Sequence, residues 1–505
     1  MKKIFTMKKR VFTLLLCLLM IVPLVLCACS NSDGDEGETT QATTLPSAEE
    51  QEKDATIENW LPVQSYGVDG GKRQVNMLTC KDYNRKYYFF RTDDGNGDTL
   101  AASSYRRFCK IEETYDVVMQ TIEPVNGGIL DTLSSSLMGQ GGEYDLVYPH
   151  PTGEMQAILE NGFYENLYNY ENIHLEQPWW SQNQVNSYTI DDKLYIAVSD
   201  FSLSGQGFIG LIFNREIYND LQIEEDLYDL VKNNAWTIAK MREIVMKYGT
   251  DSNGDDKYDA NDHYGFIYQP QHTNNFYWSF GGRIVEKDGN NDYYLAIDKD
   301  AINTMATALY NLAYNSENKV FVSNPCVYDT FAASNGWAMF KGRQGLFMTY
   351  DLGGLYSHLN EIQFKIGYLP YPKLTDEQTE YPVVCAAGFF AIPKKAPDAV
   401  MSSVLLEACS IYSYSNYRPT FFNTILLGRM SEQAEDYAML EFLHENKVFD
   451  MGFTFPAGGS DGLLYWAVVG DGEPGALASF IQARWRDMDD TLDYIENIRN
   501  GKFEG

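Results

Sequence analysis

KYYFFRT followed by DDGNGD, residues 86–98, opens the stretch of sequence that decides the fold. Residues 86–92 predict a short aromatic strand, and residues 93–98 predict a glycine-rich turn. The spacing of Phe108, Ile111 and Tyr115 predicts a helix over 100–115. The predicted elements that follow are a strand over 117–122, a helix over 129–138, a buried strand YDLVY over 144–148 and a helix over 154–160. Strands that alternate with helices predict an α/β fold, with a mainly parallel sheet covered on both faces.

Polar and aromatic residues stand directly at the ends of two of these strands. Ligands of parallel sheets bind beyond the carboxyl ends of the strands. We therefore expect Asp93, Asp94, Tyr148 and His150 to face a ligand. Farther along, the pattern predicts strands over 193–198 and 207–214 and an amphipathic helix over 236–248.

A twelve-residue acidic loop, residues 251–262, follows that helix. Asp251, Asn253, Asp255, Asp259 and Asp262 place oxygen donors at loop positions 1, 3, 5, 9 and 12, and Lys257 would offer its carbonyl at position 7. Calcium takes six or more oxygens, and this spacing is typical of calcium loops.

Two positions depart from the EF-hand pattern. Position 6 is Asp256 where EF-hands have glycine, and position 12 is Asp where they have Glu. An Asp at position 12 resembles dockerin loops. We expect a structural calcium site of weak affinity, and the alternative is an acidic turn that binds nothing.

The amino terminus has the pattern of a secretory signal. Residues 1–10 are basic, residues 11–26 are apolar, and the run closes on Leu26-Cys27-Ala28-Cys29. This ending resembles the lipobox of bacterial lipoproteins, which implies cleavage after residue 28 and a lipid on Cys29. Residues 29–59 are polar and acidic, which predicts a disordered tether. The alternative is an uncleaved amino-terminal anchor.

The charge of the chain argues against a nucleic-acid partner, and its cysteine spacing argues against a structural zinc site. The chain has 39 Lys and Arg against 70 Asp and Glu, a formal net charge of −31, so nucleic acid would be repelled. No Cys-x-x-Cys pair follows residue 29, so no structural zinc site is expected.

Short motifs along the chain occur in a specific order. They are IFNRE (212–216), NAWT (234–237), YGF (264–266), WSFGG (278–282), MFKGR (339–343), IGYLPYPK (366–373), GFFAIPK (388–394) and KVFDMG (447–452). Together they resemble the extracellular solute-binding proteins of the maltose-binding type, family 1, in the lipoprotein form of Gram-positive bacteria.

The resemblance implies a two-lobe, periplasmic-binding-protein-like fold with discontinuous lobes joined by a hinge. The first lobe would be 60–200 plus 387–453, and the second 201–386 plus 454–505. It further implies a monomer at the outer face of the cell membrane that works with ABC permease subunits. In such proteins the ligand lies between the lobes, and calcium loops stiffen one lobe away from it.

Aromatic side chains make up 14% of the chain, which favours a sugar ligand. A ring covers the C–H face of a sugar, while polar side chains bind its hydroxyls. The candidates are Trp179, Trp180, Trp278, Tyr350 with Asp351, and Trp466. The alternative for each Trp is packing in the core.

We therefore expect a substrate-binding lipoprotein of an ABC importer that captures a sugar or oligosaccharide, and not an enzyme. Peptides and other polyols are the alternative ligands. A secreted glycoside hydrolase is the main alternative, because it needs only two carboxylates about 5 to 10 Å apart. A calcium-dependent scaffold lipoprotein is the other alternative. Dockerins carry two calcium loops in tandem, whereas this sequence has one.

Overall fold

The computed structural model describes much of the chain from residue 55 onward. The described residues are 55–79, 99–124, 128–149, 161–202, 209–323, 335–351, 355, 359–385, 388–422, 434–456, 459, 462–468 and 476–502. In this part of the chain no helix combines the length and the apolar character needed to cross a membrane.

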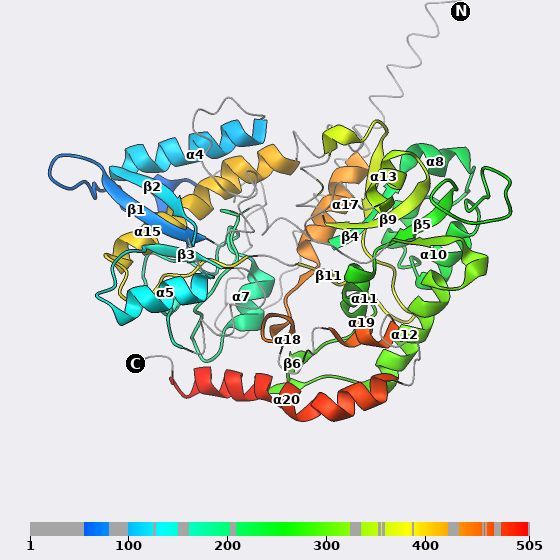
Figure 1. Ribbon diagram of the computed structural model, residues 1–505. Helices are drawn as coiled ribbons and strands as arrows, with labels where there is room; N and C mark the ends of the chain where they lie inside the picture. Colours follow the sequence, from blue (N-terminus) through cyan, green and yellow to red (C-terminus); the bar gives the residue numbers. More distant parts are fainter. Residues whose placement is uncertain are drawn as a thin grey trace, which may run out of the picture. The chain divides into compact units, whose positions relative to one another are not determined.

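A three-stranded parallel sheet forms the centre of the first lobe. Its order is β2-β1-β3, with β1 at Arg73–Thr79, β2 at Val117–Ile122 and β3 at Leu146–Tyr148. The helices of this lobe are α4 (Thr99–Tyr115), α5 (Ile129–Met138), α7 (Gln182–Tyr188) and α15 (Ala399–Tyr412) (Figure 1). The predicted elements at 100–115, 117–122, 129–138 and 144–148 are therefore confirmed.

Other sequence predictions for this lobe need correction or lie outside the described residues. The expected strand at 193–198 is present only as isolated bridges, such as Ala197 with Phe390. The expected strand at 86–92 and helix at 154–160 lie outside the described residues. The composition predicts a disordered tether over 29–59, but Ala55 and Ile57 are buried and helix α3 (Ile57–Trp60) begins within this range.

A five-stranded mixed sheet forms the centre of the second lobe. Its order is β10-β4-β9-β5-β8. The strands are β4 (Ile209–Asn214), β5 (Tyr264–Tyr268), β8 (Val320–Val322), β9 (Gly345–Asp351) and β10 (Ile366–Leu369). Strand β4 runs antiparallel to β9 and β10, and β5 runs parallel to β8 and β9. The amino end of β4 therefore shares one sheet edge with the carboxyl ends of the other four strands.

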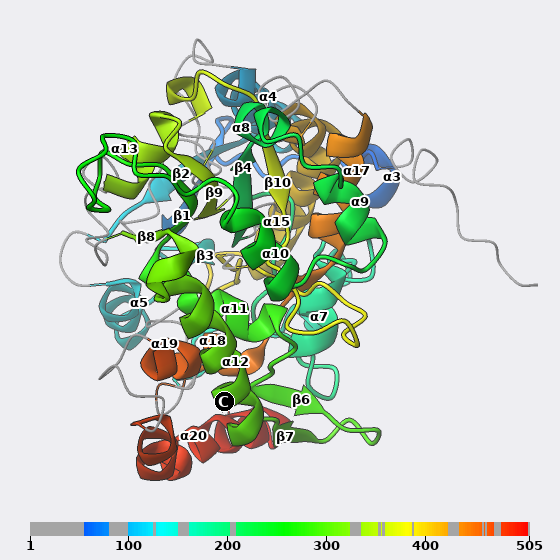
Figure 2. The same ribbon diagram turned by 90° about the vertical axis from the view of Figure 1, so that its right-hand side faces the viewer.

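Helices pack around this second sheet (Figures 1 and 2). They are α8 (Arg215–Asp220), α9 (Leu227–Lys232), α10 (Ile238–Val245), α11 (Thr273–Ser279), α12 (Lys299–Ala313), α13 (Asn335–Lys341) and α17 (Ala434–Glu445). Several begin at a capping side chain: Asn214 accepts from the backbone N–H of Glu216 and Ile217, and Thr237 accepts from that of Lys240.

Helix α17 differs from the sequence assignment. The resemblance predicts that residues 387–453 belong to the first lobe, but α17 packs against β10 of the second sheet. Its buried Asp436 pairs with Arg215 and accepts a hydrogen bond of 2.7 Å from Tyr228, both in the second lobe. The chain therefore enters the second lobe once more than the motifs indicated.

Short elements connect the lobes. Strands β11 (Val383–Val384) and β12 (Lys447–Val448) pair in parallel, and α18 (Met451–Thr454) follows β12. A hairpin of β6 (Val285–Lys287) and β7 (Tyr293–Leu295) precedes α12, while α19 spans Leu463–Val468. Single turns of 3₁₀ helix lie at Leu167–Asn169, Pro270–His272, Ser316–Asn318 and Leu359–Glu361, and a π-helical turn lies at Ser413–Tyr417.

Helix α20 (Ala476–Arg499) runs along elements of both lobes (Figure 1). Contacts with α12 and α19 join it to the second lobe. At its carboxyl end, Lys193 of the first lobe donates to the carbonyl of Arg499 at 3.0 Å, and Asp191 pairs with the Arg499 side chain at 3.2 Å. A lysine at the carboxyl end of a helix is favourable because it meets the negative end of the helix dipole.

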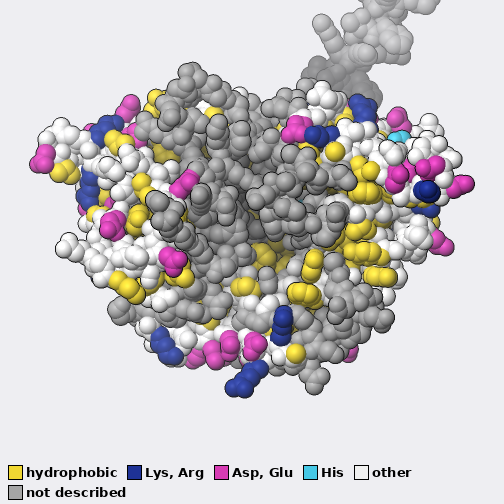
Figure 3. All heavy atoms as spheres, in the orientation of Figure 1, with side chains coloured by type: hydrophobic (Ala, Val, Ile, Leu, Met, Phe, Trp, Pro, Cys, Tyr) yellow, Lys and Arg dark blue, Asp and Glu magenta, His cyan; other side chains and the backbone are white. Residues whose placement is uncertain are grey.

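The described surface carries both acidic and basic side chains on the face drawn in Figure 3. They are scattered over this face. The whole chain has a formal net charge of −31. Cys109 and Cys409 are free thiols, and Cys409 is buried.

Candidate functional site

Tyr148 stands at the carboxyl end of β3, where the first lobe meets the connecting segments. Its hydroxyl is 2.6 Å from Ser202 Oγ, and its ring lies 4.7 Å from that of Phe390. A Cβ at Gly388 would lie only 2.3 Å from the Tyr148 ring, so only glycine permits this approach. Tyr148 is fully buried. Tyr148 lies at the predicted edge of the sheet, but its side chain packs between connecting segments and does not face a ligand, which corrects the prediction.

The facing edge of the second lobe carries Asp351 and His272. Asp351 ends β9 opposite Ile209, the first residue of β4, and is half-buried. His272 Nδ1 lies 3.0 Å from Thr349 Oγ1. Burial lowers the pKa of His272 to about 4, so its imidazole is neutral at pH 7. This edge offers neutral and anionic acceptors to a polar ligand.

Tyr350 is a core residue, which corrects the prediction that it faces the ligand. It is 1% exposed, and its ring lies 5.0 Å from that of Trp337. Tyr368 donates to the Tyr350 carbonyl at 2.8 Å. Successive residues of a strand point to opposite faces, so Tyr350 and Asp351 cannot both face the same side.

Trp179 and Trp180 are also core residues, contrary to the prediction. Their indole nitrogens donate to the two carboxylate oxygens of Glu407, at 2.8 and 2.9 Å. His174 Nδ1 lies 3.0 Å from the same carboxylate. Burial raises the pKa of Glu407, and the hydrogen bond to Glu407 raises the pKa of His174. The two tryptophans therefore fix α15 to the first lobe.

Trp278 is the third predicted aromatic that the structure buries. Its indole nitrogen donates to Asp450 at 2.9 Å, and the Asp450 carboxylate also accepts the backbone N–H of Ile284, Val285 and Gly452. Desolvation raises the pKa of Asp450. Asp450 is thus a structural residue that the sequence interpretation missed, and its position before a short helix is the signal that could have found it.

The segment after β12 is bonded to both lobes through this same region. Tyr188, the last residue of α7 in the first lobe, donates to the Asp450 carbonyl at 3.2 Å and contacts the Thr454 hydroxyl. Trp278 belongs to α11 of the second lobe. The connection between the lobes is therefore anchored on each side by a buried aromatic residue.

Trp466 is the one predicted aromatic that the structure leaves open. It lies on α19 and is 44% exposed. Its ring lies 5.8 Å from that of Tyr465, whose backbone N–H is held by Asn274 at 2.7 Å. An exposed, positioned indole can cover the apolar face of a ligand.

Four predicted residues lie outside the described residues. They are the ligand candidates Asp93, Asp94 and His150, and the lipidation candidate Cys29. Their roles stay predictions.

The acidic loop at 251–262 takes a turn that calcium loops require. Asp256 has a φ of 61°, the left-handed conformation that glycine adopts at position 6 of such loops. A bridge between Thr250 and His263 closes the loop. The substitution of glycine by Asp256 therefore does not prevent the turn.

The donor oxygens of the loop are nevertheless directed to the backbone. Asp251 accepts the N–H of Gly254 and Asp256, and Asp262 accepts the N–H of Ser252 and Asp259, at 2.7–2.8 Å. Within the described ranges, no group of three or more His, Cys, Asp or Glu side chains is placed to hold a metal ion. The donor types suit calcium, and calcium binding stays a prediction.

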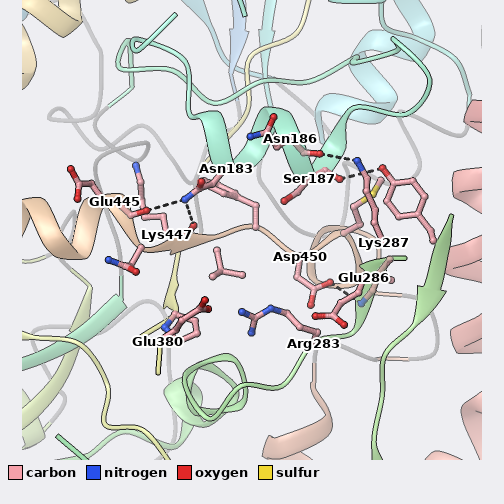
Figure 4. A pocket seen from close by; sticks show the side chains of 17 residues that line it. Asn183, Asn186, Ser187, Arg283, Glu286, Lys287, Glu380, Glu445, Lys447 and Asp450 are labelled. Atoms are coloured by element: carbon pink, nitrogen blue, oxygen red, sulfur yellow. Dashed lines mark hydrogen bonds between the residues drawn. The ribbon is translucent and has the colours of Figure 1, made fainter. Parts of the chain in front are cut away.

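A polar pocket of about 560 Å³ lies between α7, the β6–β7 hairpin and β12 (Figure 4). Figure 2 shows α7 on the side of the molecule away from α5, α13 and α19. The charged side chains in its wall are Arg283, Glu286, Lys287, Glu380, Glu445, Lys447 and Asp450. None of the ligand residues predicted from the sequence lines this pocket, which is assembled from segments distant in the sequence.

Solved structures similar to this chain are two-lobe binding proteins. One is an ABC substrate-binding protein from Listeria monocytogenes in complex with cycloalternan, with 11% identity and a TM-score of 0.51 over 85% of this chain and 99% of that chain. Another is the galacto-N-biose/lacto-N-biose I-binding protein from Bifidobacterium longum in complex with lacto-N-biose, with 14% identity and a TM-score of 0.53 over 84% and 99%.

A third similar structure has a different kind of ligand. UgpB from Mycobacterium tuberculosis, in complex with glycerophosphocholine, has 12% identity and a TM-score of 0.52 over 84% of this chain and 99% of that chain. No protein-family model matches the sequence, and no curated protein matches it. The likenesses show the two-lobe α/β fold, which confirms the predicted fold class.

Proposed function

We propose that this chain is the solute-binding protein of an ABC importer and captures a sugar or oligosaccharide between its two lobes. The observation that carries the proposal is the fold: two α/β lobes, with connecting segments anchored on both sides. Solved proteins of this fold hold cycloalternan and lacto-N-biose. Closure of two lobes around a ligand is a hinge-type population shift, and it would present both lobes to a permease.

Trp466 and Asp351 are the described residues that we propose for the sugar site. Trp466 would stack on a sugar face, and Asp351 would accept hydrogen bonds from hydroxyls. Asp93, Asp94 and His150 remain candidates from the sequence. The proposed site does not include the buried aromatic residues, which are Tyr148, Trp179, Trp180, Trp278 and Tyr350.

We further propose that the protein is a lipoprotein. Residues 1–28 would be removed, Cys29 would carry the lipid, and the polar segment that follows would hold the lobes away from the membrane. The lipobox-like ending at residues 26–29 and the acidic composition of the next residues support this. Two acyl chains on one cysteine would suffice for stable anchoring.

Calcium at the 251–262 loop is also a proposal. The twelve-residue spacing and the left-handed Asp256 support it. The side chains of Asp251, Asn253, Asp255, Asp259 and Asp262 and the Lys257 carbonyl would hold the ion, which would stiffen the second lobe.

A thermal-melt screen tests the sugar proposal. The chain without residues 1–28 and with Cys29→Ser would be melted with monosaccharides, oligosaccharides and amino acids. A ligand at 100 times its Kd stabilises the folded state by about 2.7 kcal/mol, which gives a clear rise in Tm. We expect a rise with one sugar class and unchanged sugar in solution afterwards. Release of shorter sugars would instead favour the glycoside hydrolase.

A further inference from the structure

The polar pocket between α7, the β6–β7 hairpin and β12 has the size of a ligand site. Its volume of about 560 Å³ falls in the range of small-molecule pockets. Its walls come from the first lobe through Asn183 and Asn186, and from the second through Arg283, Lys287 and the end of α17 at Glu445. The connection contributes Lys447. A molecule in this pocket would therefore touch both lobes at once.

Most charged groups in the wall already have structural roles. Lys287 Nζ donates to the carbonyls of Asn186 and Thr189 at 2.8 and 3.1 Å, which caps the carboxyl end of α7. The Asp450 carboxylate is occupied by Trp278 and three backbone N–H groups. Glu286 accepts from Tyr294 at 2.9 Å, and Lys447 Nζ lies 2.9 Å from His444 Nε2. These groups hold the pocket in shape.

Three charged side chains are left over. One terminal nitrogen of the half-buried Arg283 donates to the carbonyls of Gly282 and Trp278, at 2.7 and 3.4 Å. Its Nε and its second terminal nitrogen can therefore donate to a ligand. In the part of the chain that the structure describes, neither Arg283, Glu380 nor Glu445 has an ion pair. Figure 4 shows Arg283 extending toward Glu380, with Glu445 on another part of the wall beside Lys447.

We propose that this pocket binds a small zwitterion, an amino acid or a short peptide. Its carboxylate would pair with Arg283, whose planar guanidinium binds carboxylates through two parallel hydrogen bonds. Its ammonium group would lie near Glu380 and Glu445 at the rim. An anion would face these two carboxylates, and an uncharged ligand would leave all three charges without a partner, so a zwitterion fits best.

The pocket is distinct from the proposed sugar site and does not depend on it. Because the zwitterion touches α7 of the first lobe and β6 of the second, its binding favours the arrangement of lobes that forms the pocket. The two ligands then influence each other's affinity by the same factor in both directions. A solute receptor with this pocket senses a second class of solute.

Ligand-dependent melting and calorimetry test the proposal. The probes are the twenty amino acids and the dipeptide Gly–Gly, added to the wild-type chain and to Arg283→Gln and Glu445→Gln. Arg343→Gln is the matched control, because Arg343 is 50% exposed and pairs with Glu216 on the second lobe away from the pocket. We expect saturable binding of at least one probe, weakened at least tenfold in both pocket variants and unchanged in the control.

Three results would overturn it. They are binding by none of the probes, equal binding by Arg283→Gln and wild type, or loss of probe binding in Trp466→Ala. Sugar binding by Arg283→Gln should persist at wild-type strength. If no sugar binds, the proposed function is wrong, but zwitterion binding in this pocket is unaffected. The failure of the proposed function can therefore be distinguished from the failure of the zwitterion proposal.

Discussion

Glu407 and Trp466 show that a side chain's surroundings decide its role more than its type does. The carboxylate of Glu407 is buried, yet it accepts from two indoles and from His174. A buried carboxylate with a shifted pKa is a candidate catalytic residue, but the hydrogen bonds of Glu407 hold neighbouring side chains of the core in place. Trp466 has the same indole as Trp179 and Trp180, and its exposure alone makes it available to a ligand.

His174 makes the stability of the first lobe depend on pH. The hydrogen bond to Glu407 raises its pKa above the unfolded value of about 6.5. A raised pKa means that its contribution is fully present below about pH 6.5 and is lost as pH rises through the native pKa. We expect the urea midpoint to fall between pH 6 and 8, and to fall less in His174→Gln. An equal fall in both proteins would contradict this assignment.

Trp466→Ala should weaken sugar binding without unfolding the protein. Loss of a stacked ring costs about 1.4 kcal/mol or more, which is a tenfold rise in Kd. The control is Tyr310→Ala, which removes an exposed aromatic (38%) from α12. Calorimetry should show weaker binding only in Trp466→Ala, with Tm nearly unchanged in both. Unchanged affinity would remove Trp466 from the site.

At the scale of elements, the connection after β12 depends on one buried cap. Asp450 begins α18 and receives four N–H donors. Asp450→Ala leaves these donors buried without an acceptor, so we expect a loss of about 3 kcal/mol or more in the free energy of unfolding. The matched control is Asp298→Ala at the exposed cap of α12, which should cost about 1 kcal/mol. Equal losses in urea unfolding would show that Asp450 is an ordinary cap.

The 251–262 loop gives a prediction for calcium. Millimolar calcium should raise Tm, with a Kd of about 10⁻⁴ M or weaker, and chelator should reverse the rise. Asp251→Asn should abolish the rise. Asp288→Asn, in the acidic turn of the β6–β7 hairpin, should leave it unchanged. A Tm that is independent of calcium would show that the loop is an acidic turn only.

Local sequence patterns predicted the longer helices and strands. Most elements that were not predicted depend on pairing between residues far apart in the sequence. Helices α4, α5 and α10 and strands β2, β3 and β4 could be predicted, because their apolar periodicity is local. Strands β11 and β12 have two residues each and exist because residues 64 positions apart pair. The sequence does not predict which tryptophans are buried in the core and which are exposed to a ligand, since the same residue type occurs in both places.

At the scale of the whole molecule, the two lobes share a connection that both sides anchor. Tyr188 of the first lobe and Trp278 of the second both bond to Asp450. Helix α20 contacts α12 of the second lobe and the turn at 191–193 of the first. The sequence motifs predicted two discontinuous lobes, but the return of α17 to the second sheet depends on the Asp436 contacts, which no local pattern reveals.

Small-angle X-ray scattering tests the central claim, that a solute is captured between the lobes. The measurement compares the chain alone, with the sugar that raises its Tm, and with a sugar that does not. We predict that the radius of gyration falls only with the first sugar, because the lobes close on it. A sugar that raises Tm but leaves the radius of gyration unchanged would bind to one lobe and would contradict capture between them.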